Sequence, residues 1–199
     1  MPARAAAAPT RHYALNTPPP DAQRLRAFIK RGGVIAYATE SCYGLGCDPR
    51  NRSAVLRILR MKRRPQGKGL ILIGSDVAQF RRFLAPLPAA LADRLDEWWP
   101  GPNTLLLPAA KSCPRWLRGA HDKLAVRVSA HRDAARLCKQ VGMALVSTSA
   151  NQAGKRPLKS AAACAKAFGA KIWAIPGRIG RRKRPSRIID PGTGDIFRR

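Results

Sequence analysis

Short apolar runs and amphipathic segments alternate along this chain from about residue 21 to its end. The apolar runs have the length of strands. The amphipathic segments repeat apolar side chains at helical spacing, as Leu25, Phe28 and Ile29 do, and several of them end at glycine. This alternation predicts an α/β fold in which helices pack on one mixed sheet.

The boundaries of these segments place the expected elements. Strands are expected at residues 34–39, 70–74, 104–109, 124–129, 144–151 and 171–177. Helices are expected at residues 21–33, 51–65, 75–84, 87–99, 131–142 and 160–169. The segment 186–199 is typical of a hairpin that turns at 192–195. Gly44 and Gly46 are interpreted as turn residues, with ligand contact as the alternative.

The length of 199 residues favours a single domain. Residues 1–20 are rich in Ala and Pro and are interpreted as a flexible leader, so the folded domain is expected at 21–199. No apolar run is long enough to span a membrane, and the leader lacks the apolar region of a signal peptide. A cytoplasmic protein is therefore expected. An organelle transit peptide stays an alternative, because the leader is poor in acidic residues and carries Arg.

The charge balance and the cysteines limit the function classes. Lys and Arg number 38 against 11 Asp and Glu, which gives a formal net charge of +27. Such an excess favours binding to a polyanion, first of all RNA or DNA, although solubility alone is an alternative. The five cysteines contain no C-x-x-C pair, so they indicate reduced thiols and no metal site.

A cation-rich stretch, "MKRRPQGKGLILI" (61–73), runs into a predicted strand. Lys62 and Arg64 lie at the end of the expected helix, which Pro65 stops, so their charges are expected in a fixed loop; Lys68 lies between two glycines. The arrangement suits a polyphosphate, while a helix end that attracts cations is the alternative. If these cations lie in a loop, replacing Lys62 or Arg64 by Ala will cut activity without unfolding the protein.

Hydroxyl and amide side chains gather where predicted strands end. Thr39 ends one strand, and Ser147, Ser149 and Asn151 end another. Ligands of open α/β sheets bind at the carboxyl ends of strands, and these groups suit phosphate and carboxylate oxygens. Caps and turns are the alternative role.

Three further features carry polar groups into apolar surroundings. Arg127 lies inside an apolar strand and needs an anionic partner, either an Asp or Glu side chain or a bound carboxylate. Pro-Gly-Pro stiffens the entry to the strand at Thr104. The basic run at 178–187 is expected to be a loop, either solvated or in contact with phosphates.

Several common catalytic designs are absent from the sequence. Neither a Walker A motif nor a G-x-G-x-x-G motif occurs, and no pair of carboxylates or histidine cluster suggests acid and base catalysis. General acid and base catalysis by side chains is therefore not expected.

Together these stretches resemble the YrdC family, the threonylcarbamoyl-AMP synthases. The motifs that carry the resemblance are "ATESCYGLGCDP", "KRRP", "PGPNTLLLPA", "LAVRVSAH" and "STSAN", in the family's order and from about residue 21 onward. The sequence departs from the family pattern at Ala38, Ser41 and Cys42, and near Ile73 it lacks a histidine that some longer members carry. Five ordered motifs make the resemblance specific.

The resemblance implies a twisted mixed sheet with a basic concave cavity and a defined reaction. L-threonine, bicarbonate and ATP, usually with Mg²⁺, would form L-threonylcarbamoyl-AMP and pyrophosphate. The product would serve N6-threonylcarbamoyladenosine formation beside the tRNA anticodon, with binding to tRNA or double-stranded RNA and a downstream transferase complex as partners. An RNA-binding or ribosome-assembly protein of the same fold without synthase activity is the alternative. A carbamoyl-transfer module is a third possibility that the short length disfavours.

The resemblance also assigns roles to individual residues. The ATP-binding residues would be Lys62, Arg64, Lys68, Thr104, Ser149, Asn151 and Ser186, of which Lys62 and Arg64 would be catalytic. The threonine-binding residues would be Thr39, Arg127 and Ser147.

Overall fold

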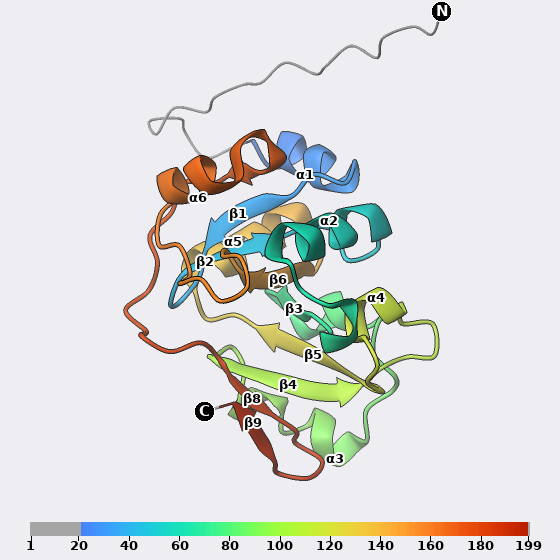
Figure 1. Cartoon of the computed structure of the whole chain (residues 1–199). Helices are drawn as coiled ribbons and strands as arrows, with labels where there is room; N and C mark the ends of the chain where they lie inside the picture. Colours follow the sequence, from blue (N-terminus) through green and yellow to red (C-terminus); the bar gives the residue numbers. More distant parts are fainter. Residues whose placement is uncertain (1–20, 199) are drawn as a thin grey trace, which may run out of the picture.

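The computed structural model describes residues 21–198, so the expected leader at 1–20 lies outside the described residues. Within this range, nine strands form one mixed sheet in the order β7-β1-β2-β6-β3-β5-β4-β8-β9, with helices packed against it (Figure 1). Strands β1 and β7, β3 and β5, and β4 and β8 pair in parallel, and the other neighbours are antiparallel. The predicted α/β fold with one mixed sheet is confirmed.

The elements have the following bounds. The strands are β1 (Ile35–Ala38), β2 (Tyr43–Gly46), β3 (Ile71–Gly74), β4 (Asn103–Pro108), β5 (Lys123–Val128), β6 (Leu145–Ser149), β7 (Trp173–Ala174), β8 (Arg187–Ile189) and β9 (Ile196–Arg198). The α-helices are α1 (Ala22–Lys30), α2 (Arg52–Lys62), α3 (Ala89–Ala92), α4 (Arg115–Arg118), α5 (Arg132–Val141) and α6 (Ala161–Phe168). Short 3₁₀ turns are η1 (Gln66–Lys68), η2 (Val77–Phe80), η3 (Leu95–Glu97) and η4 (Gly169–Lys171).

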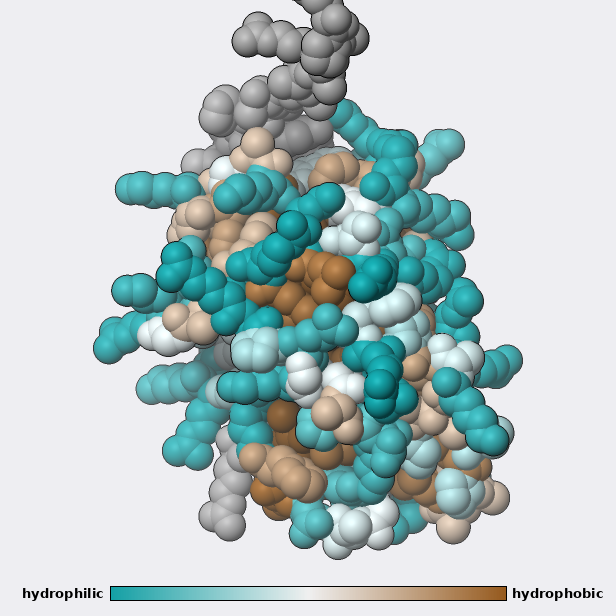
Figure 2. Space-filling model, turned by 45° about the vertical axis from the view of Figure 1, so that its right-hand side comes forward, coloured by the Kyte–Doolittle hydropathy of each residue, from teal (hydrophilic) through white to brown (hydrophobic). Residues whose placement is uncertain are grey.

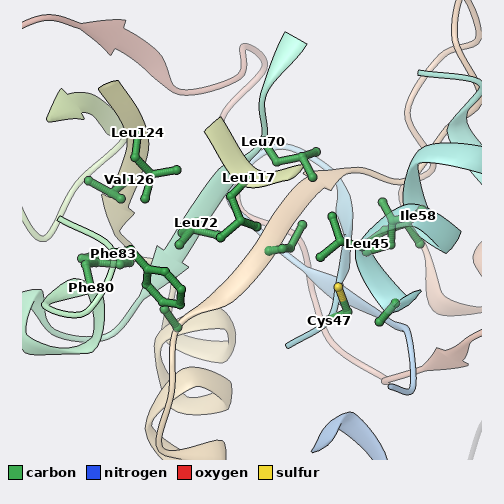
Figure 3. Close-up of a cluster of buried hydrophobic side chains, with 14 of the residues drawn as sticks. Leu45, Cys47, Ile58, Leu70, Leu72, Phe80, Phe83, Leu117, Leu124 and Val126 are labelled. Atoms are coloured by element: carbon green, nitrogen blue, oxygen red, sulfur yellow. The ribbon is translucent and has the colours of Figure 1, made fainter. Parts of the chain in front are cut away.

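Two apolar cores lie on opposite faces of the sheet, because side chains alternate along each strand. The larger core joins α2, α4 and α6 to one face, and Figure 3 shows part of it around Leu45, Ile58 and Leu117. The smaller core joins α1 and α5 to the other face around Tyr37 and Ile73. Burying a large aliphatic side chain completely contributes about 1.5–3 kcal/mol. Packing on both faces therefore stabilises the sheet.

Strand β2 corrects the interpretation of Gly44 and Gly46 as turn residues. Both glycines lie inside β2, which pairs with β1 and β6. A Cβ on Gly46 would lie 2.8 Å from Cε1 of Tyr37 and 2.9 Å from the carbonyl oxygen of Val146. Glycine is needed there for close packing rather than for a turn, so the turn prediction was wrong.

Two expected helices are only partly formed. The segment 75–84 contains just η2, capped by Asp76, because Leu84 leaves the helical path to form an isolated bridge with Ala109. The segment 87–99 divides into α3 and η3. The indole of Trp99 donates to the carbonyl oxygen of Asn103 and packs against Phe80, so tertiary contacts override the helical pattern.

The other long helices form at their expected places, although α1 and α2 end three residues early. Asp21 and Asn51 accept backbone N–H groups at the starts of α1 and α2, and Gly142 ends α5 in the left-handed region at φ 67°. Helix α2 ends at Lys62, before Pro65, and Arg63 takes the left-handed conformation at φ 51°. The terminal hairpin is confirmed as the antiparallel pair β8 and β9.

Candidate functional site

A cavity of about 1010 Å³ opens on the face of the sheet that α1 and α5 cover only in part. Its floor includes Ile71 of β3, Ala125 of β5 and Ser147 of β6, which share a face with the smaller core by strand alternation. The cavity therefore lies beside α1 and α5, over the part of this face that the two helices leave uncovered.

Cations surround this cavity. Its basic lining residues are Arg64, Lys68, Arg118, Lys123, Arg127, Arg156, Lys159, Lys183 and Arg198, and its acidic ones are Asp122 and Asp190. Lys123 pairs with Asp190, and Arg118 lies 3.8 Å from Asp122, so both acids already have basic neighbours. The cavity can therefore hold a strongly anionic ligand. Figure 2 shows one face of the molecule, on which hydrophilic side chains surround an apolar patch near the centre.

The structure brings most of the predicted site residues to this cavity. Those that line it are Thr39, Arg64, Lys68, Arg127, Ser147, Ser149 and Ser186. Those behind the lining are Lys62, Thr104 and Asn151. Thr104 is fully buried, and its hydroxyl lies 2.8 Å from that of Ser186. Thr104 can therefore act on a ligand only through Ser186.

Lys62 corrects the expectation of a loop cation. It is the last residue of α2, only 5% exposed, and its ammonium donates to the carbonyl oxygens of Ser149 and Asn151, the latter at 2.9 Å. Burial, with a smaller contribution from the charge of Arg64, lowers the pKa of Lys62 to about 8. Lys62 therefore fixes the Ser149–Asn151 segment from behind.

Arg64 projects to the cavity instead. One terminal nitrogen donates to the carbonyl oxygen of Gly69 at 3.0 Å, while its buried Nε has no hydrogen-bond partner among the described residues. Burial lowers the pKa of Arg64 from its ordinary value. Lys68 lines the same cavity and is exposed. Arg64 thus offers a desolvated, incompletely paired guanidinium to an anion.

An ion pair supplies one of the two partners expected for Arg127. Its terminal nitrogen lies 3.0 Å from a carboxylate oxygen of Glu40, and the other oxygen of Glu40 accepts from Ser129 at 2.9 Å. Glu40 is therefore an anionic partner of Arg127, and Arg127 also lines the cavity. Thr39 donates its hydroxyl to the carbonyl oxygen of Cys42 at 2.7 Å, which fixes the turn after β1.

The sequence reasoning missed Arg198 as a cavity residue. Its guanidinium donates to the carbonyl oxygen of Ser186 at 2.8 Å and to the Ser186 hydroxyl at 2.9 Å. Burial lowers the pKa of Arg198, and the charges of Arg127 and Arg64 lower it further. The positive charges of Arg64, Arg127 and Arg198 therefore influence one another in this part of the cavity. The only sequence signal was a basic residue after the terminal apolar pair.

The basic run at 178–187 crosses the cavity rim. The N–H of Gly180 donates to the carbonyl oxygen of Thr39 at 3.0 Å, and that of Arg182 donates to the carbonyl oxygen of Glu40 at 3.2 Å. The expected loop structure is confirmed for the part that precedes β8. These two hydrogen bonds hold the loop, which carries Lys183 of the cavity lining, beside the turn that begins at Thr39.

Other expected features can be compared with the described residues. All five cysteines are free, as predicted. Nowhere in residues 21–198 do three or more His, Cys, Asp or Glu side chains gather as a metal site requires. None of the helices described combines the length and apolar character needed to cross a membrane.

The fold and the cavity define an α/β protein with a cavity on its sheet that is lined by many basic side chains. Residues 27–199 match the model of the Sua5/YciO/YrdC family, described as "Telomere recombination". The protein belongs to the Sua5/YciO/YrdC family, and the resemblance seen in its motifs is confirmed.

Relatives of high identity bear a common name. The chain is 54% identical over 176 residues to a threonylcarbamoyl-AMP synthase of Chromobacterium violaceum, with 88% of this chain and 91% of the relative covered. It is 51% identical over 174 residues to one of Thiobacillus denitrificans, with 87% and 93% covered.

Solved structures share the fold. Sua5 of P. abyssi complexed with L-threonine matches with a TM-score of 0.77 at 33% identity, over 86% of this chain and 52% of that chain. This chain therefore spans about half of that protein. E. coli YciO matches with a TM-score of 0.75 at 24% identity over 90% of both chains, which shows the fold alone.

Proposed function

We propose that this protein is a threonylcarbamoyl-AMP synthase, which forms L-threonylcarbamoyl-AMP and pyrophosphate from L-threonine, bicarbonate and ATP. The observation that carries the proposal is the convergence of hydroxyl groups and cations from separate motifs on one cavity. The relatives named threonylcarbamoyl-AMP synthase and the threonine-bound P. abyssi Sua5 support it.

The reaction needs alignment more than covalent help from the protein. The threonine amine and bicarbonate form a carbamate and release water. One carbamate oxygen then bonds to the α-phosphorus of ATP while the bond from that phosphorus to the pyrophosphate oxygen breaks. The bonding pair leaves with pyrophosphate. Such transfer depends on in-line positioning and on stabilising the charge of the phosphates. This requirement agrees with a cavity rich in cations.

The roles divide between the cavity wall and the cavity floor. We assign Arg64 and Lys68 to the ATP phosphates, with Ser149 and Ser186 beside the nucleotide, while Arg198 joins them as a residue identified from its place in the cavity. Lys62, Asn151 and Thr104 would act by holding Ser149 and Ser186 in place.

The amino acid would bind at the floor. Thr39, Arg127 and Ser147 are each less than 10% exposed and lie on or directly after strands. The Glu40 ion pair fixes the guanidinium of Arg127 before substrate arrives. A small substrate that must be aligned accurately is best served by such rigid groups.

We treat Mg²⁺ as part of the ATP substrate. Mg²⁺ in phosphate-transfer sites is held by one or two carboxylates together with the substrate phosphates. Asp122 lines the cavity with an exposed side chain and fits such a supporting role, whereas Asp190 is occupied by Lys123. The metal would partly neutralise the phosphates that Arg64 and Lys68 contact.

Several wider assignments belong to the same proposal. Residues 21–199 would form one YrdC-like domain after a leader at 1–20. The protein would act in the cytoplasm for N6-threonylcarbamoyladenosine formation on tRNA, handing its product to a downstream transferase complex. The formal net charge of +27 supports contact with tRNA or double-stranded RNA.

The direct test measures pyrophosphate release from ATP by the full chain. Release should require both threonine and bicarbonate, and omission of either should return it to background. A folded protein that releases none under these conditions would refute the synthase proposal and favour an RNA-binding protein of the same fold.

A further inference from the structure

A buried tyrosine lies directly behind the amino-acid part of the cavity. Tyr37 of β1 is 2% exposed and belongs to the smaller core, on the same face of the sheet as Ile73 and Leu145. Its hydroxyl donates to Oγ of Ser147 at 2.8 Å. Ser147 lines the cavity and Tyr37 does not, so this hydrogen bond joins the core to the floor.

The direction of this hydrogen bond follows from burial. The Tyr37 hydroxyl makes no other hydrogen bond among the described residues, so its proton would be buried without an acceptor if it did not go to Ser147. An unmade buried hydrogen bond costs about 1–3 kcal/mol. Burial also raises the pKa of Tyr37, which keeps its hydroxyl protonated and able to donate.

The consequence concerns the proton of Ser147. A serine hydroxyl has one proton and two acceptor lone pairs, and Tyr37 occupies one of the lone pairs. Ser147 donates to no group in the described part of the chain, and it faces the cavity. Its single proton is therefore free to be donated to a ligand there.

We infer that Tyr37 is a positioning residue, which orients Ser147 so that the serine hydroxyl donates to an oxygen of the amino-acid substrate. The inference rests on the proposed function, since it assigns the floor to the amino acid. Tyr37 itself touches no substrate. It acts by restricting the rotation of Ser147 before the substrate binds.

Threonine- and bicarbonate-dependent pyrophosphate release tests the inference on the full chain. Tyr37→Phe removes only the hydroxyl. It should raise the KM for threonine about fivefold to tenfold, the loss expected for one ordinary hydrogen bond, and change the KM for ATP less than about twofold. Ser147→Ala should have the same selective effect, and the double variant should be no worse than the poorer single one.

Tyr43→Phe is the matched control. Tyr43 is also buried, but its hydroxyl donates to the carbonyl oxygen of Gly177 at 2.9 Å, away from Ser147. Its loss should lower the melting temperature and leave the KM for threonine unchanged. A purely structural role of Tyr37 would make the two tyrosine variants behave alike.

Several results would overturn the inference. An unchanged KM for threonine in Tyr37→Phe would do so, as would equal increases for both substrates or independent, multiplying effects in the double variant. If Tyr37→Phe does not fold, Ser147→Ala decides, because a wild-type KM for threonine in that variant removes the role of the hydroxyl. A wild-type protein without threonine-dependent release would refute the proposed function, and the inference with it. An active wild type with unaltered variants refutes the inference alone.

Discussion

The floor and the rim of the cavity are built in different ways. On the floor, Thr39 and Arg127 are 7% exposed and have intramolecular partners, the carbonyl of Cys42 and the carboxylate of Glu40. On the rim, the cations Lys68, Arg156, Lys159 and Lys183 are exposed on loops. The floor is ordered by the packing of the sheet before any ligand binds, whereas the rim attracts ligand by charge. Arg64 lies between the two, half-buried and only partly paired.

Replacing Arg64 should give the largest effect on activity. Arg64→Ala removes a desolvated cation from the wall of the cavity and should lower kcat/KM about 100-fold, the loss typical of one charge-stabilising donor. The fold should persist, since Arg64 lies outside both apolar cores. Pyrophosphate release measures the first effect and thermal unfolding the second.

Arg60→Ala is the control for this comparison. Arg60 is exposed on α2, one turn before Arg64, and does not line the cavity. Its replacement should leave activity within about twofold. Equal activities of the Arg64 and Arg60 variants would remove the phosphate assignment.

Replacing Lys62 should affect stability as well as activity. Lys62→Met removes the buried ammonium that donates to the carbonyl oxygens of Ser149 and Asn151, which should lower the free energy of unfolding by about 1–3 kcal/mol. Urea unfolding measures this loss. Lys166→Met, on the exposed side of α6, is the control and should cost little. Identical stabilities would show that the ammonium does not fix this segment.

Salt should separate the rim from the floor. Exposed charges are screened strongly as ionic strength rises, and buried pairs much less. Between about 0.05 and 0.5 M KCl, the KM for ATP should rise several-fold while the KM for threonine changes less than about twofold. Parallel changes in both constants would show that the two parts do not differ in this way.

The last comparison concerns the pH dependence that Lys62 contributes. The pKa of Lys62 in the folded protein, about 8, lies below its ordinary value of 10.5, so between these two pH values the unfolded chain binds more protons at this group. The contribution of Lys62 to the free energy of unfolding therefore rises as pH increases from 8 toward 10.5. Below pH 8, the destabilisation that comes from burying the charged ammonium is fully present. Over that pH range, the free energy of unfolding of the wild type should increase relative to that of Lys62→Met. A difference independent of pH would contradict the lowered pKa.

The sequence predicted the elements whose local signals and packing agree. Helix α5 shows an apolar face with Gly142 at its end, and the structure forms it as expected. The segment 87–99 shows a similar apolar pattern, but Trp99 is held against Phe80 and by Asn103, and the helix breaks. Gly46 carries no signal that distinguishes a turn from a crowded strand, since the atoms that crowd it belong to Tyr37 and Val146. Contacts between distant residues account for these failures.

What the chain determined by itself was its class, its charge and the residue types that reach the cavity, because helical spacing, strand length and motif order are local properties. Tertiary structure decided which of two cations in one motif is buried: Lys62 lies under Ser149 and Asn151, and Arg64 faces the cavity. It also paired Arg127 with Glu40 and placed Tyr37 behind Ser147. The physical reason is that a partner for a buried polar group is set by the packing of strands and helices far apart in the chain, which local pattern does not encode.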